Sequence, residues 1–316
     1  MKPGVFSDFK VFSGNAHIEL AEEIASIMGK PLGKSIVSCF SDGEISVTLT
    51  EMVRGLDCFI IQPTCCPVNN NLMELLIMID AMMRASAGRI NVVLPYYGYA
   101  RQDRKAKARD PITAKLVANL IVAAGADRVL SMDLHAAQIQ GYFDIPVDHL
   151  LGLPILVKYF QKKKLEDIVF VSPDHGSVSR ARAMAQPFEC PIAIVDKRRN
   201  KPNQSEVMHV IGDIEGKTAI LVDDMIDTAG TITTAASALK EMGANDVYAC
   251  ATHPVLSGNA IELIEKSAIK EMVLLNTIPI PKEKMSDKIK TLSVAPLFAE
   301  AMIRIFTHES ISKLFD

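Results

Sequence analysis

The stretch Ala219-Ile220-Leu221-Val222-Asp223-Asp224-Met225-Ile226-Asp227-Thr228-Ala229-Gly230-Thr231 carries the strongest structural signal in the chain. Its first four residues are apolar and typical of a buried strand. Asp223 and Asp224 follow at the end of that strand, and Asp227 comes at a tight turn before a helical pattern. Backbone N–H groups in such a turn, with the helix N-terminus behind it, bind phosphate. Carboxylates beside a phosphate pocket suit sugar hydroxyls or a divalent cation. The stretch therefore predicts a sugar-phosphate site, and a plain strand with its turn is the alternative.

The composition is typical of a globular protein with two domains. The chain has 316 residues, of which 49% are hydrophobic, and a net charge of -3. This charge argues against nucleic-acid binding through a global basic field. The six cysteines have no metal-ligand spacing and read as reduced cytosolic thiols. Signal-peptide and membrane-spanning patterns are absent from the sequence. We therefore expect a cytoplasmic protein that binds neither nucleic acid nor membranes.

Apolar runs rich in β-branched residues alternate with helical patterns along the chain. Such alternation predicts an α/β fold built from βαβ units, with mostly parallel sheets flanked by helices. The expected strands are 57–61, 90–95, 128–132, 168–171, 192–195, 219–222 and 247–250, and the expected helices are 71–85, 111–124 and 231–242.

An internal repeat divides the chain into two halves. At one constant spacing, Thr113, Gly125 and His135 of the first half recur as Thr231, Gly243 and His253. We infer two homologous α/β domains in tandem, residues 1–149 and 150–316, and roughly the last 20 residues are expected to pack back on the first domain. Chance similarity between two βα units is the alternative, because glycine is common at helix C-caps.

Two basic loops interrupt the repeat. Residues 101–109 hold five basic side chains where the second half has its acid pair. In this loop Arg101 and Gln102 are well placed to hold a polyphosphate, for which arginine offers bidentate contacts. Residues 197–203 form a second basic loop after the strand at 192–195. Positive charge there would stabilise charge that develops on a transferred phosphoryl group. For both loops, solvated surface is the alternative.

Three further positions suit a nucleotide and its metal ion. His135 and Asp174 each follow the carboxyl end of an expected strand, where ligands of open α/β sheets bind. One imidazole and one carboxylate could share a hydrated Mg²⁺, although a structural histidine is the alternative, and His175 is a competing ligand or a mere neighbour. The segment 40–44, Phe-Ser-Asp-Gly-Glu, could stack on a purine and accept its hydrogen bonds, but by itself it favours the simpler reading of a turn that links two strands.

Together these segments make the chain resemble the ribose-phosphate diphosphokinase family, in its bacterial-like, phosphate-activated class. The resemblance extends along nearly the whole chain and implies two tandem domains of the phosphoribosyltransferase type. It implies transfer of the β,γ-diphosphoryl group of ATP to the anomeric hydroxyl of ribose 5-phosphate, with Mg²⁺ as cofactor, for nucleotide, histidine and tryptophan biosynthesis. The matching segments are 40–44, 71–76, 99–103, 133–136, 171–174, 197–199 and 223–231.

The resemblance also implies a role for individual residues. It assigns catalysis to Lys197 and Arg199, and the metal to His135 and Asp174. The implied ATP site consists of Phe40, Asp42, Gly43, Glu44, Arg101 and Gln102. The implied ribose 5-phosphate site consists of Arg199, Asp223, Asp224, Asp227, Thr228, Ala229, Gly230 and Thr231.

Regulation and assembly are implied as well. The family resemblance predicts a homohexamer that inorganic phosphate activates and ADP inhibits, at a site that would draw on Arg54, Gln140, Ser310 and Ser312. One departure concerns the loop after Asp174, where relatives commonly have two glycines and this chain has Gly176-Ser177. A positive φ at Ser177 would be costly, so we expect its backbone to avoid one.

Two other functions would share part of this pattern. A nucleobase phosphoribosyltransferase has the same sugar-phosphate loop but consumes the diphosphate product, and the tandem domains and ATP-side residues argue against it. A silent regulatory relative would assemble with an active subunit, and the presence of Lys197, Arg199, His135 and Asp174 argues against that reading.

Overall fold

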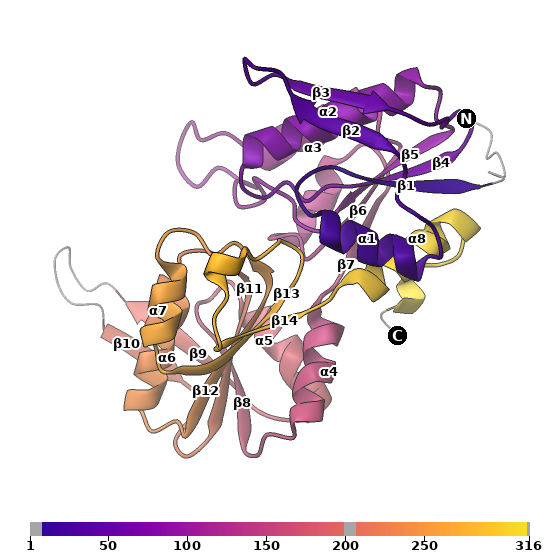
Figure 1. Cartoon of the computed structure of the whole chain (residues 1–316). Helices are drawn as coiled ribbons and strands as arrows, with labels where there is room; N and C mark the ends of the chain where they lie inside the picture. The colour runs from indigo at the N-terminus through magenta and orange to yellow at the C-terminus, as the bar shows by residue number, and fades with distance from the viewer. Residues whose placement is uncertain (1–7, 199–206, 315–316) are drawn as a thin grey trace. The chain divides into compact units, whose positions relative to one another are not determined.

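A computed structural model describes residues 8–198 and 207–314, and the chain divides into two compact units. The first unit comprises the chain up to Leu151, Thr277–Pro279 and the segment from Ser293 onward; the second comprises Gly152–Asn276 and Ile280–Leu292. Both units are mixed α/β with mostly parallel sheets flanked by helices, which confirms the predicted fold class (Figure 1). Among the helices in these ranges, none has the length and apolarity needed to cross a bilayer.

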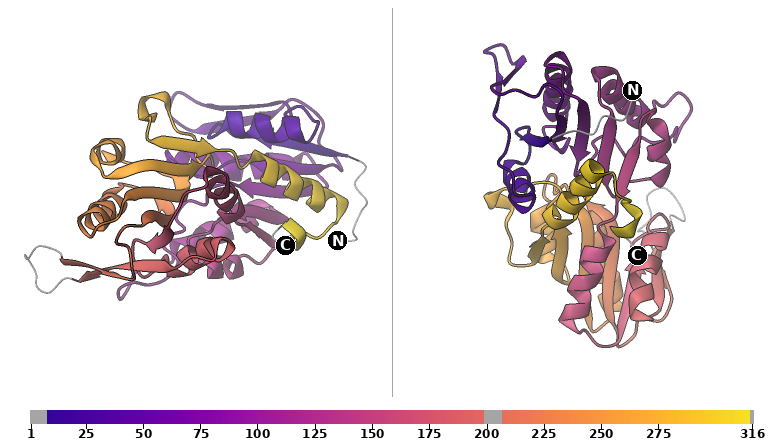
Figure 2. Two further views of the ribbon diagram at one scale, coloured as in Figure 1. Left: turned by 90° about the horizontal axis from the view of Figure 1, so that it is seen from below. Right: turned by 90° about the vertical axis from the view of Figure 1, so that its right-hand side faces the viewer.

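The first unit is built on a five-stranded parallel sheet in the order β1-β4-β5-β6-β7. A separate hairpin of β2 and β3 lies along α2, and α1 lies alongside α8 in each view of Figures 1 and 2. Strand β4 is buried along its whole length because it lies inside the sheet. The strands are β1 (Phe9–Ser13), β2 (Ser35–Cys39), β3 (Ile45–Leu49), β4 (Asp57–Ile61), β5 (Arg89–Leu94), β6 (Arg128–Met132) and β7 (Val147–Leu150); the helices are α1 (Ile18–Ile27), α2 (Val68–Arg84), α3 (Thr113–Ala124) and α8 (Ala295–Thr307), with short 3₁₀ turns η1 (Ala137–Tyr142) and η4 (Ser312–Leu314).

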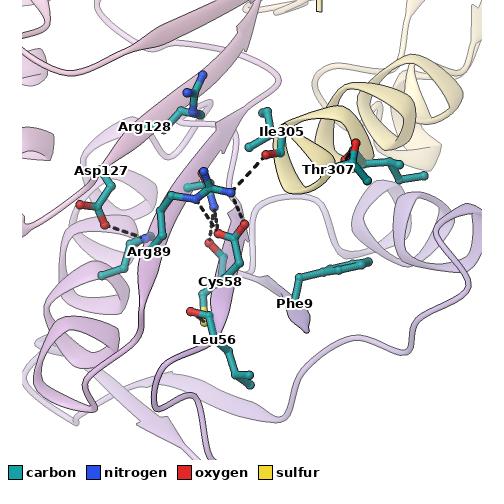
Figure 3. Close-up of polar contacts among 12 residues, drawn as sticks. Phe9, Leu56, Cys58, Arg89, Asp127, Arg128, Ile305 and Thr307 are labelled. Atoms are coloured by element: carbon teal, nitrogen blue, oxygen red, sulfur yellow. Dashed lines mark hydrogen bonds and ion pairs between the residues drawn. The ribbon is translucent and has the colours of Figure 1, made fainter. Parts of the chain in front are cut away.

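A buried ion pair connects the sheet of the first unit to its C-terminal helix. Asp57 on β4 is fully buried and accepts hydrogen bonds from the Arg89 guanidinium, one of them from Nε at 3.0 Å, and from the side-chain amide of Asn91. Arg89 Nη2 also donates to the backbone carbonyl of Ile305 on α8 at 3.2 Å. Figure 3 shows Arg89 reaching from the sheet toward Ile305. This contact joins residues far apart in the sequence and holds α8 on the first unit.

The second unit has a seven-stranded sheet in the order β10-β9-β8-β11-β12-β13-β14, in which β10 alone is antiparallel to its neighbour. Helix α4 packs on α5, and α6 packs on α7. The strands are β8 (Ile168–Ser172), β9 (Ile192–Arg198), β10 (Val207–Ile211), β11 (Thr218–Ile226), β12 (Asp246–Pro254), β13 (Ile269–Leu275) and β14 (Ile289–Leu292); the helices are α4 (Leu153–Lys163), α5 (Val178–Ala185), α6 (Gly230–Glu241) and α7 (Ala260–Lys266), with 3₁₀ turns η2 (Gln186–Phe188) and η3 (Lys282–Lys284).

Each predicted strand and helix is present, with ends that differ by a few residues. The largest difference at a functional position concerns β11, which extends to Ile226 and not to residue 222. The prediction that Asp223 and Asp224 follow the strand is therefore wrong, because both lie within it. The reason is tertiary: β12 continues beside β11, so that Asp223 pairs with Ala251 and Ile226 with Pro254.

Candidate active site

A pocket lies at the end of β11, in front of helix α6. Its volume is about 120 Å³, and Asp223 and residues 225–232 line it. Ala229, the residue before α6, has a left-handed backbone with φ of 62° and gives the helix no side-chain cap. The backbone N–H groups of the first turn of α6 therefore remain for a bound anion, which the positive end of the helix dipole also attracts.

Hydrogen bonds from a neighbouring loop hold the turn that leads into α6. The Ser257 hydroxyl donates to the carboxylate of Asp227, and the Ser257 backbone N–H donates to the Asp227 carbonyl at 3.0 Å. The N–H of Leu256 donates to the carbonyl of Ile226 at 2.8 Å. This loop thus fixes the Asp227 turn, and Thr228 and Thr231 remain exposed beside the pocket.

The acid pair differs in its electrostatics from ordinary surface carboxylates. Burial, with the neighbouring negative charge of Asp224, raises the pKa of Asp223 to about 7. Hydrogen bonds to Asp223 from the Ser177 hydroxyl and the Asp224 backbone N–H oppose this rise. A carboxyl group with a raised pKa beside a pocket is a feature typical of functional sites.

The side chain of Asp174 stabilises the loop that follows β8. Asp174 Oδ1 accepts from the N–H groups of Gly176 at 2.8 Å and of Ser177 at 3.0 Å. A Cβ on Gly176 would lie 3.3 Å from that oxygen, so glycine suits the close approach. Ser177 has a φ of -94°, which confirms that its backbone avoids the left-handed region. Exposed His175 contacts Asp196 on β9, with Nε2 3.1 Å from Oδ1.

Lys197 lies at the carboxyl end of β9, where its backbone pairs with Met208 of β10. Strand β9 is parallel to β8, and β8 is parallel to β11. The ends of these three strands therefore share one edge of the sheet with the pocket. The side chain of Lys197 and the whole of Arg199 lie outside the described residues.

The residues expected to bind ATP lie on two exposed segments of the first unit. Residues 40–44 form the tip of the β2–β3 hairpin, as the simpler reading predicted, and Phe40 is 60% exposed there. Arg101 and Gln102 lie on the loop before α3, both exposed. The Gln102 side chain accepts from the Thr113 hydroxyl, and its carbonyl accepts from Ala114 N–H at 3.2 Å, so α3 anchors this end of the loop.

His135 is exposed on the loop that follows β6. Two residues earlier, Asp133 has a φ of 38°, a strained conformation for a residue other than glycine. The N–H of Leu134 donates to Nε2 of His149 on β7 at 3.0 Å, which fixes the loop from the neighbouring strand. Within the described ranges, no group of three or more histidine, cysteine or acidic side chains is arranged to hold a metal ion.

The four residues expected at an effector site all belong to the first unit. Arg54 is exposed and pairs through its backbone with Ala87. Gln140 contacts the His149 ring, with Nε2 3.2 Å from Nδ1. The hydroxyl oxygens of Ser310 and Ser312 are 2.6 Å apart on the exposed C-terminal segment. None of these contacts tests the effector role of the four residues, which stays a prediction.

Comparisons with known proteins identify the family. The model for the N-terminal domain of ribose phosphate pyrophosphokinase matches residues 9–125, and the model for the phosphoribosyl synthetase-associated domain matches residues 172–316. A ribose-phosphate pyrophosphokinase from Clostridium tetani is 68% identical over 97% of each chain. This chain belongs to the ribose-phosphate pyrophosphokinase family. A second member, from Clostridium perfringens, is 66% identical over 98% of each chain.

Structural similarity agrees with membership of the ribose-phosphate pyrophosphokinase family. The crystal structure of phosphoribosylpyrophosphate synthetase from Mycobacterium smegmatis superposes with a TM-score of 0.92 at 44% identity. The match covers 96% of this chain and 100% of that one. The family resemblance inferred from the motifs is thereby confirmed, and the chain is an enzyme of this family.

Sequence reasoning missed the contacts that Ser177, the N-cap residue of α5, and Arg180 in α5 make with the acid pair. The Ser177 hydroxyl donates to Asp223 Oδ1 at 2.7 Å, and Arg180 Nη1 lies 3.8 Å from Asp224 Oδ1. The sequence distance between α5 and β11 concealed both contacts. Ser177 offered one signal, as a serine where the family resemblance implied a glycine, but that signal pointed to a backbone effect and not to a side-chain donor.

Proposed function

We propose that this enzyme transfers the β,γ-diphosphoryl group of ATP to the anomeric hydroxyl of ribose 5-phosphate. The products are AMP and 5-phosphoribosyl 1-diphosphate. The second product serves nucleotide, histidine and tryptophan biosynthesis. The new bond joins the anomeric oxygen to the β-phosphorus, and the bond between the α,β-bridging oxygen and the β-phosphorus breaks. The hydroxyl proton leaves, and AMP departs with the bridging oxygen.

The observation that carries this proposal is the pocket at the N-terminus of α6. A sugar phosphate fits its chemistry, because the pocket lies at the N-terminus of α6 and the Asp223 carboxyl group is part of its lining. In the proposed complex, residues 227–231 hold the 5-phosphate, and the carboxylates of Asp223 and Asp224 accept from ribose hydroxyls. Binding both substrates in fixed positions supplies most of the rate enhancement in phosphoryl transfer.

The ATP side of the proposed site uses exposed residues of the first unit. Phe40 offers an aromatic face for adenine, and Asp42 and Glu44, with the Gly43 turn, offer acceptors for its polar groups or the ribose. Arg101 and Gln102 would hold the polyphosphate. Lys197 and Arg199 would neutralise charge that develops on the transferred group.

Mg²⁺ is the proposed cofactor, with His135 and Asp174 as its protein ligands. Both side chains are exposed, and one imidazole with one carboxylate suits an ion that keeps most of its water ligands. Two backbone N–H groups occupy Asp174 Oδ1, which leaves Oδ2 for a cation. When bound, Mg²⁺ would neutralise phosphate charge on the nucleotide.

We also propose that the enzyme works in the cytoplasm as a homohexamer, activated by inorganic phosphate and inhibited by ADP. Arg54, Gln140, Ser310 and Ser312 are the candidate effector residues. Their exposed or half-buried positions in the first unit are compatible with an anion site.

Formation of AMP without any nucleobase tests the reaction. We expect the purified enzyme with ATP, ribose 5-phosphate and Mg²⁺ to release AMP and 5-phosphoribosyl 1-diphosphate in equal amounts, measured by anion-exchange chromatography. A nucleobase phosphoribosyltransferase would form neither product from these substrates. Absence of AMP, with sugar phosphate unchanged, would exclude the proposed reaction.

The raised pKa of Asp223 predicts how ribose 5-phosphate affinity depends on pH. An ionised carboxylate accepts hydroxyl hydrogen bonds better than a protonated one, and Asp223 is protonated below about pH 7. The KM for ribose 5-phosphate should therefore fall as pH rises from 6 to 8. The substrate phosphate titrates with a pKa of about 6 in the same range, so Asp223→Asn is measured in parallel. An identical pH slope in both proteins would contradict the assignment.

A further inference from the structure

Ser177 occupies the N-cap position of helix α5 but does not cap that helix. Its φ and ψ are -94° and 5°, and its side chain makes no capping hydrogen bond. Serine is favoured at N-caps because its oxygen accepts from the N–H groups of the first turn. Since the Ser177 hydroxyl makes no such bond, helix capping does not explain the side chain at this position.

The hydroxyl is directed to the acid pair instead. Ser177 Oγ donates to Asp223 Oδ1 at 2.7 Å, and the backbone N–H of Asp224 donates to the same oxygen at 2.9 Å. Ser177 is only 9% exposed, so little water competes for this bond. Hydrogen bonds to an ionised acceptor are stronger than neutral ones. Two donors on one oxygen fix the rotation of the Asp223 carboxyl group.

The first turn of α5 places the guanidinium group of Arg180 beside Asp224. Arg180 Nη1 lies 3.8 Å from Asp224 Oδ1 and, among the described residues, has no hydrogen-bond partner although it is buried. The N-cap residue of α5 thus supplies a hydrogen-bond donor to Asp223, and the first turn of the helix supplies a positive charge to Asp224. The hydrogen bond from Ser177 opposes the burial and mutual repulsion that favour protonation of Asp223.

We propose that Ser177 is a positioning residue for ribose 5-phosphate, which holds the Asp223 carboxylate in the orientation that accepts the sugar hydroxyls. The inference rests on the proposed function, in which Asp223 binds the ribose. A glycine or alanine at this position would offer no hydroxyl. Ser177 therefore gives this chain a donor to Asp223 that a glycine cannot supply.

Substitutions at two serines of the same helix test the proposal. We expect Ser177→Ala and Ser177→Gly to raise the KM for ribose 5-phosphate about tenfold, as loss of a hydrogen bond to a charged group predicts. The KM for ATP and the thermal midpoint should not change. Ser177→Thr keeps the hydroxyl and should restore the KM. Ser179→Ala removes an exposed hydroxyl from the same turn and is the matched control.

Several results would overturn the proposal. These are an unchanged KM for ribose 5-phosphate in Ser177→Ala, an equal rise in the KM for both substrates, or no rescue by threonine. Calorimetric titration of the same variants with ribose 5-phosphate separates this inference from the reaction itself. If the wild-type enzyme forms no AMP, the proposed function fails; if it forms AMP and Ser177→Ala binds the sugar normally, only the role of Ser177 fails.

Discussion

Replacing Lys197 with alanine is expected to lower kcat about 1,000-fold while the fold remains intact. The strand ends of β8, β9 and β11 share one sheet edge, so the backbone brings residue 197 to the edge that carries Asp174 and the Asp223 pocket. Charge that develops on a transferred diphosphoryl group is stabilised best by a cation already in place. Without the lysine, the transition state loses this stabilisation, whereas ground-state binding of ribose 5-phosphate loses little.

Steady-state kinetics and circular dichroism of Lys197→Ala provide the measurement. Lys197→Arg keeps the charge and should retain more turnover than the alanine variant. Lys270→Ala is the matched control, since Lys270 is an exposed lysine of the same unit paired with Asp246. Turnover near that of the wild type in Lys197→Ala, with an unchanged spectrum, would refute the assigned role.

The second large effect is expected on stability, from Asp57→Ala. Asp57 is fully buried, and its loss leaves the charge of Arg89 without its carboxylate partner. Removing one partner of a buried ion pair costs about 3–5 kcal/mol. The thermal midpoint should therefore fall by on the order of 10 °C. Because Arg89 also donates to Ile305, amide hydrogen exchange in α8 should accelerate as the helix loosens.

A comparison of variants separates the effect of breaking the ion pair from the effect of losing side-chain volume. Arg89→Met leaves Asp57 charged and buried, and it should also destabilise strongly. The double variant Asp57→Asn with Arg89→Met removes both charges and should be more stable than Asp57→Ala. Asp80→Ala breaks an exposed pair with Arg84 on α2 and should change the midpoint little. An unchanged midpoint in Asp57→Ala would mean that the pair does not hold α8.

Local sequence patterns predicted most of the secondary structure, including the turn between β11 and α6. Their success has a physical reason, because hydrophobic period and turn chemistry depend on neighbouring residues. The left-handed Gly125 at the end of α3 is an example, since its helix C-cap follows from the local sequence. The roles of the catalytic, ATP and metal residues stay predictions, of which the Lys197 variants address the catalytic one.

Tertiary structure decided the features that depend on contacts between segments distant in the sequence. The acid pair lies within β11 because β12 continues beside it, and no property of residues 219–224 alone specifies that length. The C-terminal helix belongs to the first unit because Arg89 and α1 contact it. Ser177 meets Asp223 because α5 packs beside β11. The sequence by itself determined the α/β pattern, the family and the turn before α6. Three-dimensional packing decided the environment of Asp223 and Asp224, because burial and hydrogen-bond partners come from residues distant in the chain.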